Sequence, residues 1–226
     1  MAYLDDLGLF PKLRDAGAEF WTAYTDHTFV TQLGDGTLPR AAFRHYLGQD
    51  YLFLIHFARA YALAAYKAES LSEIRDAAAG MRAIVDTEMA LHVAYCADWG
   101  LDEAAMEALP EASATIAYTR YVLEKGGQGD LLDLYVALAP CVIGYGEIGE
   151  RLAADPATVR SGNPYASWIE MYAGEEYQSV ARAHGEVLDR LWRTRAGGER
   201  LASLSRTFAQ ATRLEADFWQ MGLETA

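Results

Sequence analysis

The stretch 43–61 reads FRHYLGQDYLFLIHFARAY and indicates the class of the fold. Its large apolar residues recur every three or four positions, which is the period of one face of an α-helix and not the alternation of a half-buried strand. We expect one long helix that begins after Thr37-Leu38-Pro39 and reaches about Tyr66. The inward face of this helix comprises Phe43, Tyr46, Leu47, Asp50, Leu54, Phe57 and Tyr61.

The rest of the chain continues in the same period. Proline occurs only six times, β-branched clusters are few, and no convincing strand is found. We therefore predict an all-α protein with a single domain over residues 1–226. The expected helices span about 8–25, 39–66, 70–97, 113–125, 130–154, 175–195 and 197–224, with a short one before Pro110 and another after Asn163-Pro164. Gly126-Gly127 is expected to end the helix at 113–125.

Composition and charge exclude several classes of function. The 226 residues include 52% hydrophobic and 23% charged residues, which suits a folded core rather than a disordered chain. The net charge of −13 repels phosphate backbones and anionic lipids, so we expect no nucleic-acid or membrane partner. Two cysteines are too few for a disulfide framework, and the N-terminus carries acid where a signal peptide carries base. We therefore expect a cytoplasmic location.

Three helices carry a reactive side chain on their apolar face, where burial is costly unless the group is partnered. Asp50 lies among the aromatic residues of the 39–66 helix. Glu215 lies one turn from Phe218 in the last helix, where apolar surroundings would raise its pKa and suit an acid or base. Cys141, directly after Pro140, occupies the apolar face of the 130–154 helix and could act as a nucleophile.

Each of these residues also has a purely structural interpretation. Cys141 could be a small core residue, and Asp50 and Glu215 could cap a loop or pair with an arginine. The presence of all three groups on the inner faces of three helices favours a functional site. Tyr118, Tyr145 and Tyr172 share inner faces with these groups, and tyrosines around a carboxylate can enclose a flat heteroaromatic ligand.

Two further motifs are weaker. Glu88 and His92 have a spacing that can bind metal. A di-metal bundle, however, needs a Glu-x-x-His motif on each of two helices, and the sequence has neither of these motifs. We expect a hydrogen-bonded pair of Glu88 and His92, and no metal or cofactor. Residues 144–149 match G-x-G-x-x-G, yet a dinucleotide site needs a strand before it. These glycines are expected to let a neighbouring helix or an aromatic ligand approach closely.

Several of these residues, in order and spacing, resemble the TenA family, also called thiaminase II, over nearly the whole chain. The motifs that carry the resemblance are Gln49-Asp50-Tyr51, Glu88 with His92, Pro140-Cys141 followed by Tyr145, Trp168-Ile169-Glu170-Met171-Tyr172, and Glu215-Ala216-Asp217-Phe218-Trp219. The resemblance implies a haem-oxygenase-like helical bundle without haem, a homotetramer, and hydrolysis of aminopyrimidines in thiamin salvage.

The resemblance also implies residue roles. Cys141 would add to the pyrimidine ring, Asp50 would hold the ring nitrogen and amino group, and Glu215 would protonate the leaving group. Tyr118 and Tyr172 would contact the substrate, with Tyr145 close to the thiol. Tyr165 is an alternative to Tyr172, because the stretch 155–163 is longer than expected. Phe53 stands where some members of the family carry tyrosine, so one hydroxyl is lost.

We expect the first of three functions, and the other two are its alternatives. The first is a hydrolase that acts on 4-amino-5-aminomethyl-2-methylpyrimidine and, as a further substrate, on thiamin. The second is a non-catalytic or regulatory protein, since some members of the family are labelled transcriptional activators. The high negative charge and only three lysines disfavour direct DNA contact. The third is a metal-dependent oxidase on the same scaffold.

Overall fold

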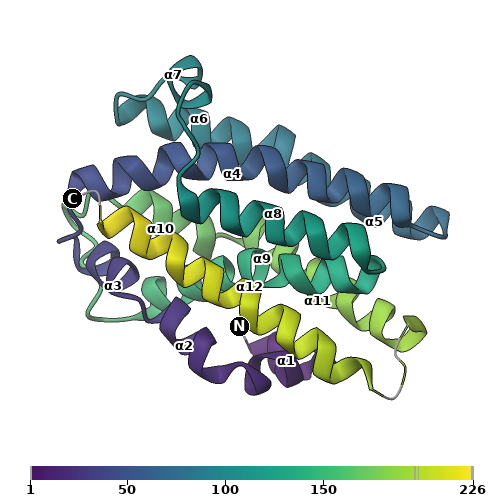
Figure 1. Ribbon diagram of the computed structural model, residues 1–226. Coiled ribbons are helices and arrows are strands. Elements are labelled where there is room, and N and C mark those ends of the chain that lie inside the picture. The colour runs from purple at the N-terminus through teal and green to yellow at the C-terminus, as the bar shows by residue number, and fades with distance from the viewer. Residues whose placement is uncertain (1, 196, 198, 225–226) are drawn as a thin grey trace. The chain divides into compact units, whose positions relative to one another are not determined.

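The computed structural model describes residues 2–195, 197 and 199–224, and all regular elements within them are helical (Figure 1). The prediction of an all-α fold is therefore confirmed. The chain divides into two compact units. The first unit combines Met1–Leu38 with Tyr135–Trp219, and the second combines Pro39–Leu134 with Gln220–Ala226. The assignment of residues 1–226 to a single domain stays a prediction.

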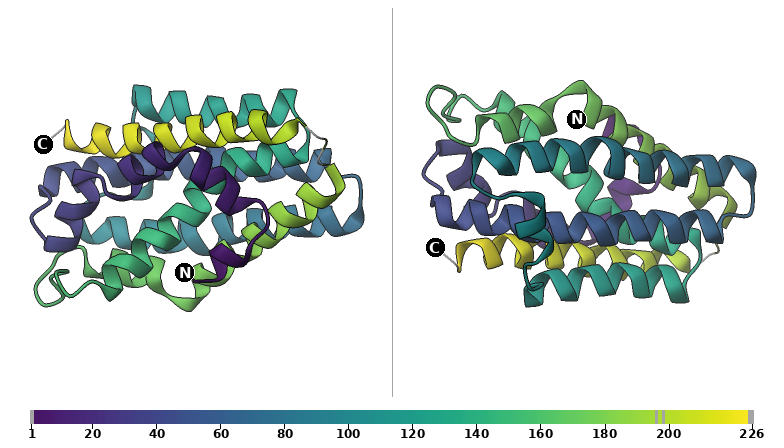
Figure 2. Two further views of the ribbon diagram at one scale, coloured as in Figure 1. Left: turned by 90° about the horizontal axis from the view of Figure 1, so that it is seen from below. Right: turned by 90° about the horizontal axis from the view of Figure 1, so that it is seen from above.

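The second unit is organised around the long helix α4. Its helices are α4 (Arg40–Lys67), α5 (Leu71–Arg82), the π-helical segment η2 (Ala83–Glu88), α6 (Met89–Asp98), α7 (Glu103–Glu107) and α8 (Ser113–Gln128). The run from α5 through η2 to α6 matches the predicted helix at 70–97 and lies alongside α4 (Figure 2, right). α8 packs on α4 as well. Side chains of α4 therefore meet two neighbouring helices.

The predicted end of α8 at Gly126-Gly127 is wrong, because the helix continues to Gln128. A Cβ atom added at Gly126 would lie 2.8 Å from a methyl carbon of Leu134 and 2.9 Å from one of Leu63. Gly126 is thus required by close packing within the helix and does not terminate it.

A buried amide ties α8 to α4. Gln49 Nε2 donates to the Pro110 carbonyl at 3.0 Å. Its Oε1 accepts from Ala112 N at 2.8 Å and from Thr115 Oγ1 at 2.7 Å. Because the amide binds the residues that lead into α8 and its first turn, it fixes where that helix starts relative to α4.

The first unit contains η1 (Ala2–Asp6), α1 (Phe10–Ala16), α2 (Ala18–Thr25), α3 (Thr28–Asp35), α10 (Ala166–Ala173) and α11 (Glu175–Arg195), and most of α9 (Leu131–Ala154) and α12 (Arg200–Leu223). The predicted helix at 8–25 is divided at Gly17, where the chain passes close to Ala209. Ala196 and Gly198, at the predicted boundary before the last helix, lie outside the described residues.

Helix α3 is absent from the sequence-based expectation. Its N-cap is His27, whose Nδ1 accepts from Phe29 N at 3.2 Å, and histidine is not one of the usual capping residues. Its C-cap is Gly36 with φ of 77°, a left-handed conformation that favours glycine. Gly36 therefore marks the end of α3.

Helix α9 is the most apolar of the long helices. By length and composition it could cross a membrane, but most of its side chains are buried inside the protein, as in the core helix of a globular fold. Its glycines allow close approach. A Cβ at Gly144 would lie 2.3 Å from the Tyr24 ring, and one at Gly149 would lie 2.6 Å from the Tyr172 backbone. The interpretation of these two positions as packing glycines is confirmed.

We predict opposite effects of alanine at two helical glycines. Gly149→Ala should lower the free energy of unfolding by about 1–3 kcal/mol, because the backbone of Tyr172 cannot rotate away from the new methyl group. Gly127→Ala is the matched control. Nothing lies within 4 Å of its Cβ, so alanine should raise stability by about 0.5–1 kcal/mol through helix propensity. Urea unfolding measures both, and equal stability of the two variants would contradict the prediction.

Candidate functional site

In the first unit, a thiol and a carboxyl group each lie one helical turn before an aromatic contact. Cys141 and Tyr145 are one turn apart on α9, and Glu215 and Trp219 are one turn apart on α12. The rings of Tyr145 and Trp219 meet with centroids 5.2 Å apart. Glu215 is only 2% exposed, which confirms that it faces inward, and Cys141 is half-buried.

Helix α10 adds two more rings to this aromatic cluster. Tyr172 lies 5.0 Å from Tyr145 and 4.4 Å from Trp168, measured between ring centroids. The hydroxyl of Tyr165 instead donates to the Leu38 carbonyl. Of the two tyrosines that the sequence left open, Tyr172 is therefore the one favoured by the cluster around Tyr145.

A buried amide also holds α10 in place. Gln178 Nε2 donates to the Tyr172 carbonyl at 2.8 Å and to the Gly146 carbonyl at 2.9 Å. Both acceptors are backbone groups, so the bonds fix the end of α10 against α9 at the level of Tyr145. Gln178 carries no local sequence motif that predicts this role, because its partners lie on other helices.

In the second unit, Asp50 lies one turn before Phe53 on α4. Phe53 contacts Tyr118 of α8 with ring centroids 5.0 Å apart, so these three predicted residues occupy neighbouring positions on α4 and α8. Asp50 is 4% exposed, which confirms its inward direction. The Tyr46 hydroxyl donates to Asp50 Oδ2 at 3.3 Å.

Burial raises the pKa of Asp50 to about 7, and the hydrogen bond from Tyr46 acts in the opposite direction. Removing a carboxylate from water disfavours its charged form, and one hydrogen bond from a neutral hydroxyl compensates only in part. Asp50 can therefore gain or lose a proton near neutral pH. Such a perturbed carboxyl group is typical of functional sites.

The contacts of His92 with α4 differ from the expected pairing with Glu88. His92 Nε2 lies 2.8 Å from the Leu47 carbonyl oxygen, and its Nδ1 lies 3.5 Å from Asp50 Oδ2, so both ring nitrogens face α4. Burial lowers the pKa of His92 to about 4. Among the residues that the structure describes, no three His, Cys, Asp or Glu side chains form a group that could hold a metal ion.

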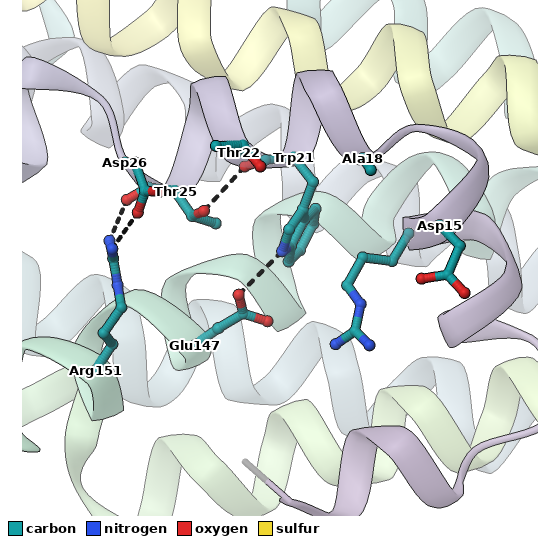
Figure 3. Close-up of a pocket in the computed structure, with 9 residues that line it drawn as sticks. Asp15, Ala18, Trp21, Thr22, Thr25, Asp26, Glu147 and Arg151 are labelled. Atoms are coloured by element: carbon teal, nitrogen blue, oxygen red, sulfur yellow. Dashed lines mark hydrogen bonds and ion pairs between the residues drawn. The ribbon is translucent and has the colours of Figure 1, made fainter.

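A pocket of about 470 Å³ lies elsewhere in the first unit, between α1, α2 and α9 (Figure 3). Trp21 Nε1 donates to Glu147 Oε1 at 3.0 Å within it, and Arg151 pairs with Asp26. None of the predicted site residues lines this pocket. The lining residues are Arg14, Asp15, Ala18, Trp21, Thr22, Thr25, Asp26, Glu147 and Arg151.

Comparison with known proteins gives relatives over nearly the full chain. An aminopyrimidine aminohydrolase of Halalkalibacterium halodurans is 36% identical over 211 residues, covering 93% of each chain. The crystal structure of a TenA family transcription regulator from Silicibacter sp. TM1040 is 48% identical with a TM-score of 0.91, covering 96% of each chain.

A third similarity concerns the fold alone. A domain with a heme oxygenase-like fold from Shewanella denitrificans has a TM-score of 0.71 at 14% identity and covers 93% of this chain and 90% of its own. This confirms the haem-oxygenase-like architecture. The model of the TENA/THI-4/PQQC family matches residues 14–225. The chain therefore belongs to this family, and within it to the TenA proteins.

Proposed function

We propose that the protein is an aminopyrimidine aminohydrolase of thiamin salvage in the cytoplasm. The substrate is 4-amino-5-aminomethyl-2-methylpyrimidine, and the products are the hydroxymethylpyrimidine and ammonia. Support comes from relatives of that name at 28–36% identity. The observation that carries the proposal is a half-buried thiol and two buried carboxyl groups, each one helical turn from an aromatic residue that packs against another ring.

The proposed reaction uses Cys141 as nucleophile. Its sulfur forms a bond to a ring carbon of the pyrimidine while Asp50, bound to the ring nitrogen and the amino group, supplies a proton to that nitrogen. The exocyclic methylene carbon then expels its amine, which Glu215 protonates so that ammonia leaves. Water adds to the methylene carbon and returns a proton to Glu215, the sulfur departs from the ring as the thiolate in which it attacked, the ring nitrogen returns its proton to Asp50, and aromaticity returns.

The aromatic side chains have a binding role in this proposal. As the resemblance to the TenA family implies, Tyr118, Tyr145, Tyr172 and Phe53 are the aromatic residues proposed to contact the flat ring of the substrate. Phe53 provides a ring face but no hydroxyl group, so it contributes stacking alone. The reaction on thiamin, in which the thiazole replaces ammonia as leaving group, is part of the proposal as a second substrate.

Ammonia release from the aminomethylpyrimidine tests the proposal. The wild-type protein should be active, and Cys141→Ala should lose on the order of a hundredfold or more in kcat/KM, because no other group can form the bond to the ring. Thiamin in a parallel assay ranks the substrates. An inactive wild-type protein that contains stoichiometric iron or manganese would support the oxidase alternative instead.

Alkylation by iodoacetamide gives a control within the same molecule. Cys141 is half-buried, whereas Cys96 is fully buried and its pKa is raised to about 12 by burial and by the charge of Asp50. The reagent should therefore modify Cys141 first and abolish activity, and substrate should protect against it. Peptide mass spectrometry reads the site, and loss of activity through Cys96 alone would contradict the assigned nucleophile.

A regulatory function is the second candidate, since the relative from Silicibacter is described as a transcription regulator. The net charge of −13 opposes binding to a phosphate backbone. We therefore expect no retained complex in an electrophoretic mobility shift assay at low salt, with promoter DNA from the organism itself. Sequence-specific retention that survives competitor DNA would favour the regulatory function.

We also propose that the protein is a homotetramer, as its resemblance to the TenA family implies. The supporting feature is a stripe of exposed apolar side chains along α5 and η2, which is unusual on a monomer of this charge. Its members are Leu71 (61% exposed), Ile74 (41%), Met81 (36%) and Val85 (51%).

Light scattering after gel filtration should show that Ile74→Glu lowers the mass of the assembly, because a buried glutamate in each copy opposes association. Ile116→Glu is the matched control. Ile116 on α8 is 43% exposed, close to the 41% of Ile74, but lies outside the stripe. A monomeric wild-type protein, or an Ile74→Glu variant of unchanged mass, would contradict this use of the stripe.

A further inference from the structure

The protonation of His92 follows from its partners. Its Nε2 lies 2.8 Å from the Leu47 carbonyl oxygen, which can only accept a hydrogen bond, so Nε2 carries a hydrogen. The low pKa of His92, about 4, means that the ring holds no second proton at neutral pH. Nδ1 therefore presents a lone pair.

This lone pair faces Asp50. Nδ1 and Asp50 Oδ2 are 3.5 Å apart, and both side chains are 6% exposed. If Asp50 is ionised, two electron-rich atoms oppose each other in a site that water does not reach, and they repel. If Asp50 is protonated, its O–H can point at Nδ1 and the interaction becomes attractive.

Other groups near Asp50 do not supply a positive charge. From α4 itself the neutral Tyr46 hydroxyl approaches Oδ2, and from α6 the Cys96 thiol lies within electrostatic range. Cys96 stays protonated because its pKa is raised to about 12. Neither the Tyr46 hydroxyl, whose hydrogen bond lowers the pKa of Asp50, nor the Cys96 thiol gives the carboxylate a positively charged partner.

We propose that His92 is a positioning residue that keeps Asp50 in its neutral carboxyl form, ready to donate a proton to a ring nitrogen of the substrate. The part that concerns the substrate rests on the function proposed above. Both described contacts of Asp50 use Oδ2, so Oδ1 can accept from the amino group of a 4-aminopyrimidine. When substrate binds, the O–H turns from Nδ1 of His92 to the ring nitrogen while Oδ1 accepts from the amino group, whereas a carboxylate would oppose the lone pair of that nitrogen.

The proton inventory of the step is balanced. When the nucleophile, already a thiolate, adds to the ring, the carboxyl proton of Asp50 moves to the ring nitrogen and Asp50 becomes a carboxylate. When the thiolate leaves, the proton returns to Asp50. His92 stays neutral throughout and touches no reacting atom. The π-helical segment η2 ends at Glu88, just before His92. Such segments are rare in proteins, and those that occur are often found at functional sites.

A carbon-13 NMR titration of the ligand-free protein tests the proposal without any assay of activity. The protein is labelled at the carboxyl carbon of aspartate, and Asp50→Asn identifies the Asp50 signal. In the wild-type protein Asp50 should titrate near pH 7. In His92→Gln, whose amide can still donate to Leu47, its pKa should fall by one unit or more, an about tenfold loss of proton affinity.

His184→Gln is the matched control. His184 Nε2 lies 3.0 Å from the Tyr135 carbonyl oxygen, and burial lowers its pKa to about 4, as for His92. The same substitution there should leave the titration of Asp50 unchanged. An unshifted Asp50 in His92→Gln, or an equal shift in both variants, overturns the proposal.

Two further measurements test the same proposal. If His92→Gln does not fold, the nitrogen-15 chemical shifts of the His92 imidazole in the wild-type protein test the proposal instead. A doubly protonated ring, or a hydrogen on Nδ1, at pH 8 overturns the proposal. With active enzyme, the alkaline limb of the kcat/KM profile should move to lower pH in His92→Gln together with the Asp50 titration. A wild-type protein that titrates as expected but releases no ammonia refutes the proposed function and leaves the effect of His92 on Asp50 standing.

Discussion

The need to partner buried polar side chains is the constraint on which the rest of this structure depends. The core consists of apolar helix faces, where an unpartnered amide or carboxyl group costs several kilocalories per mole. Gln49 and Gln178 meet this constraint by binding main-chain groups of neighbouring helices. Because those groups lead into α8 or belong to α9 and α10, the two amides set the positions from which Tyr118 and Tyr172 project. Positioning of the aromatic side chains thus begins with hydrogen bonds inside the core.

Asp50 meets the same constraint in a different way. Its described partners are a neutral hydroxyl, which compensates a negative charge only in part, and a neutral imidazole, which does not compensate it. The unfavourable energy of ionisation is therefore not cancelled and persists as a raised pKa of about 7. An arginine in the place of His92 would have given a stable ion pair with a low pKa. A carboxyl group that exchanges its proton near neutral pH is more useful for chemistry than such a pair.

The sequence predicts those parts of the fold that depend on one helix at a time. The apolar period is enough to place α4, α9 and α11, and it shows that Asp50 and Glu215 face inward. It fails where another segment decides the outcome. Gly126 continues α8 because of contacts with Leu63 and Leu134, and Gly17 divides the first helix where the chain passes Ala209. A glycine signal alone does not distinguish a terminator from a packing position.

The same limit applies to the site. Glu88 and His92 have the spacing of a pair on one helix, but the imidazole faces α4, and that choice depends on how α6 packs there. The two cysteines show what packing adds. Both lie in apolar surroundings, yet Cys96 is fully buried near Asp50 with a pKa of about 12, while Cys141 is half-buried. A thiol that cannot ionise cannot attack a ring carbon, so the burial and charge around each sulfur, more than its place in a pattern, separate a core residue from a candidate nucleophile.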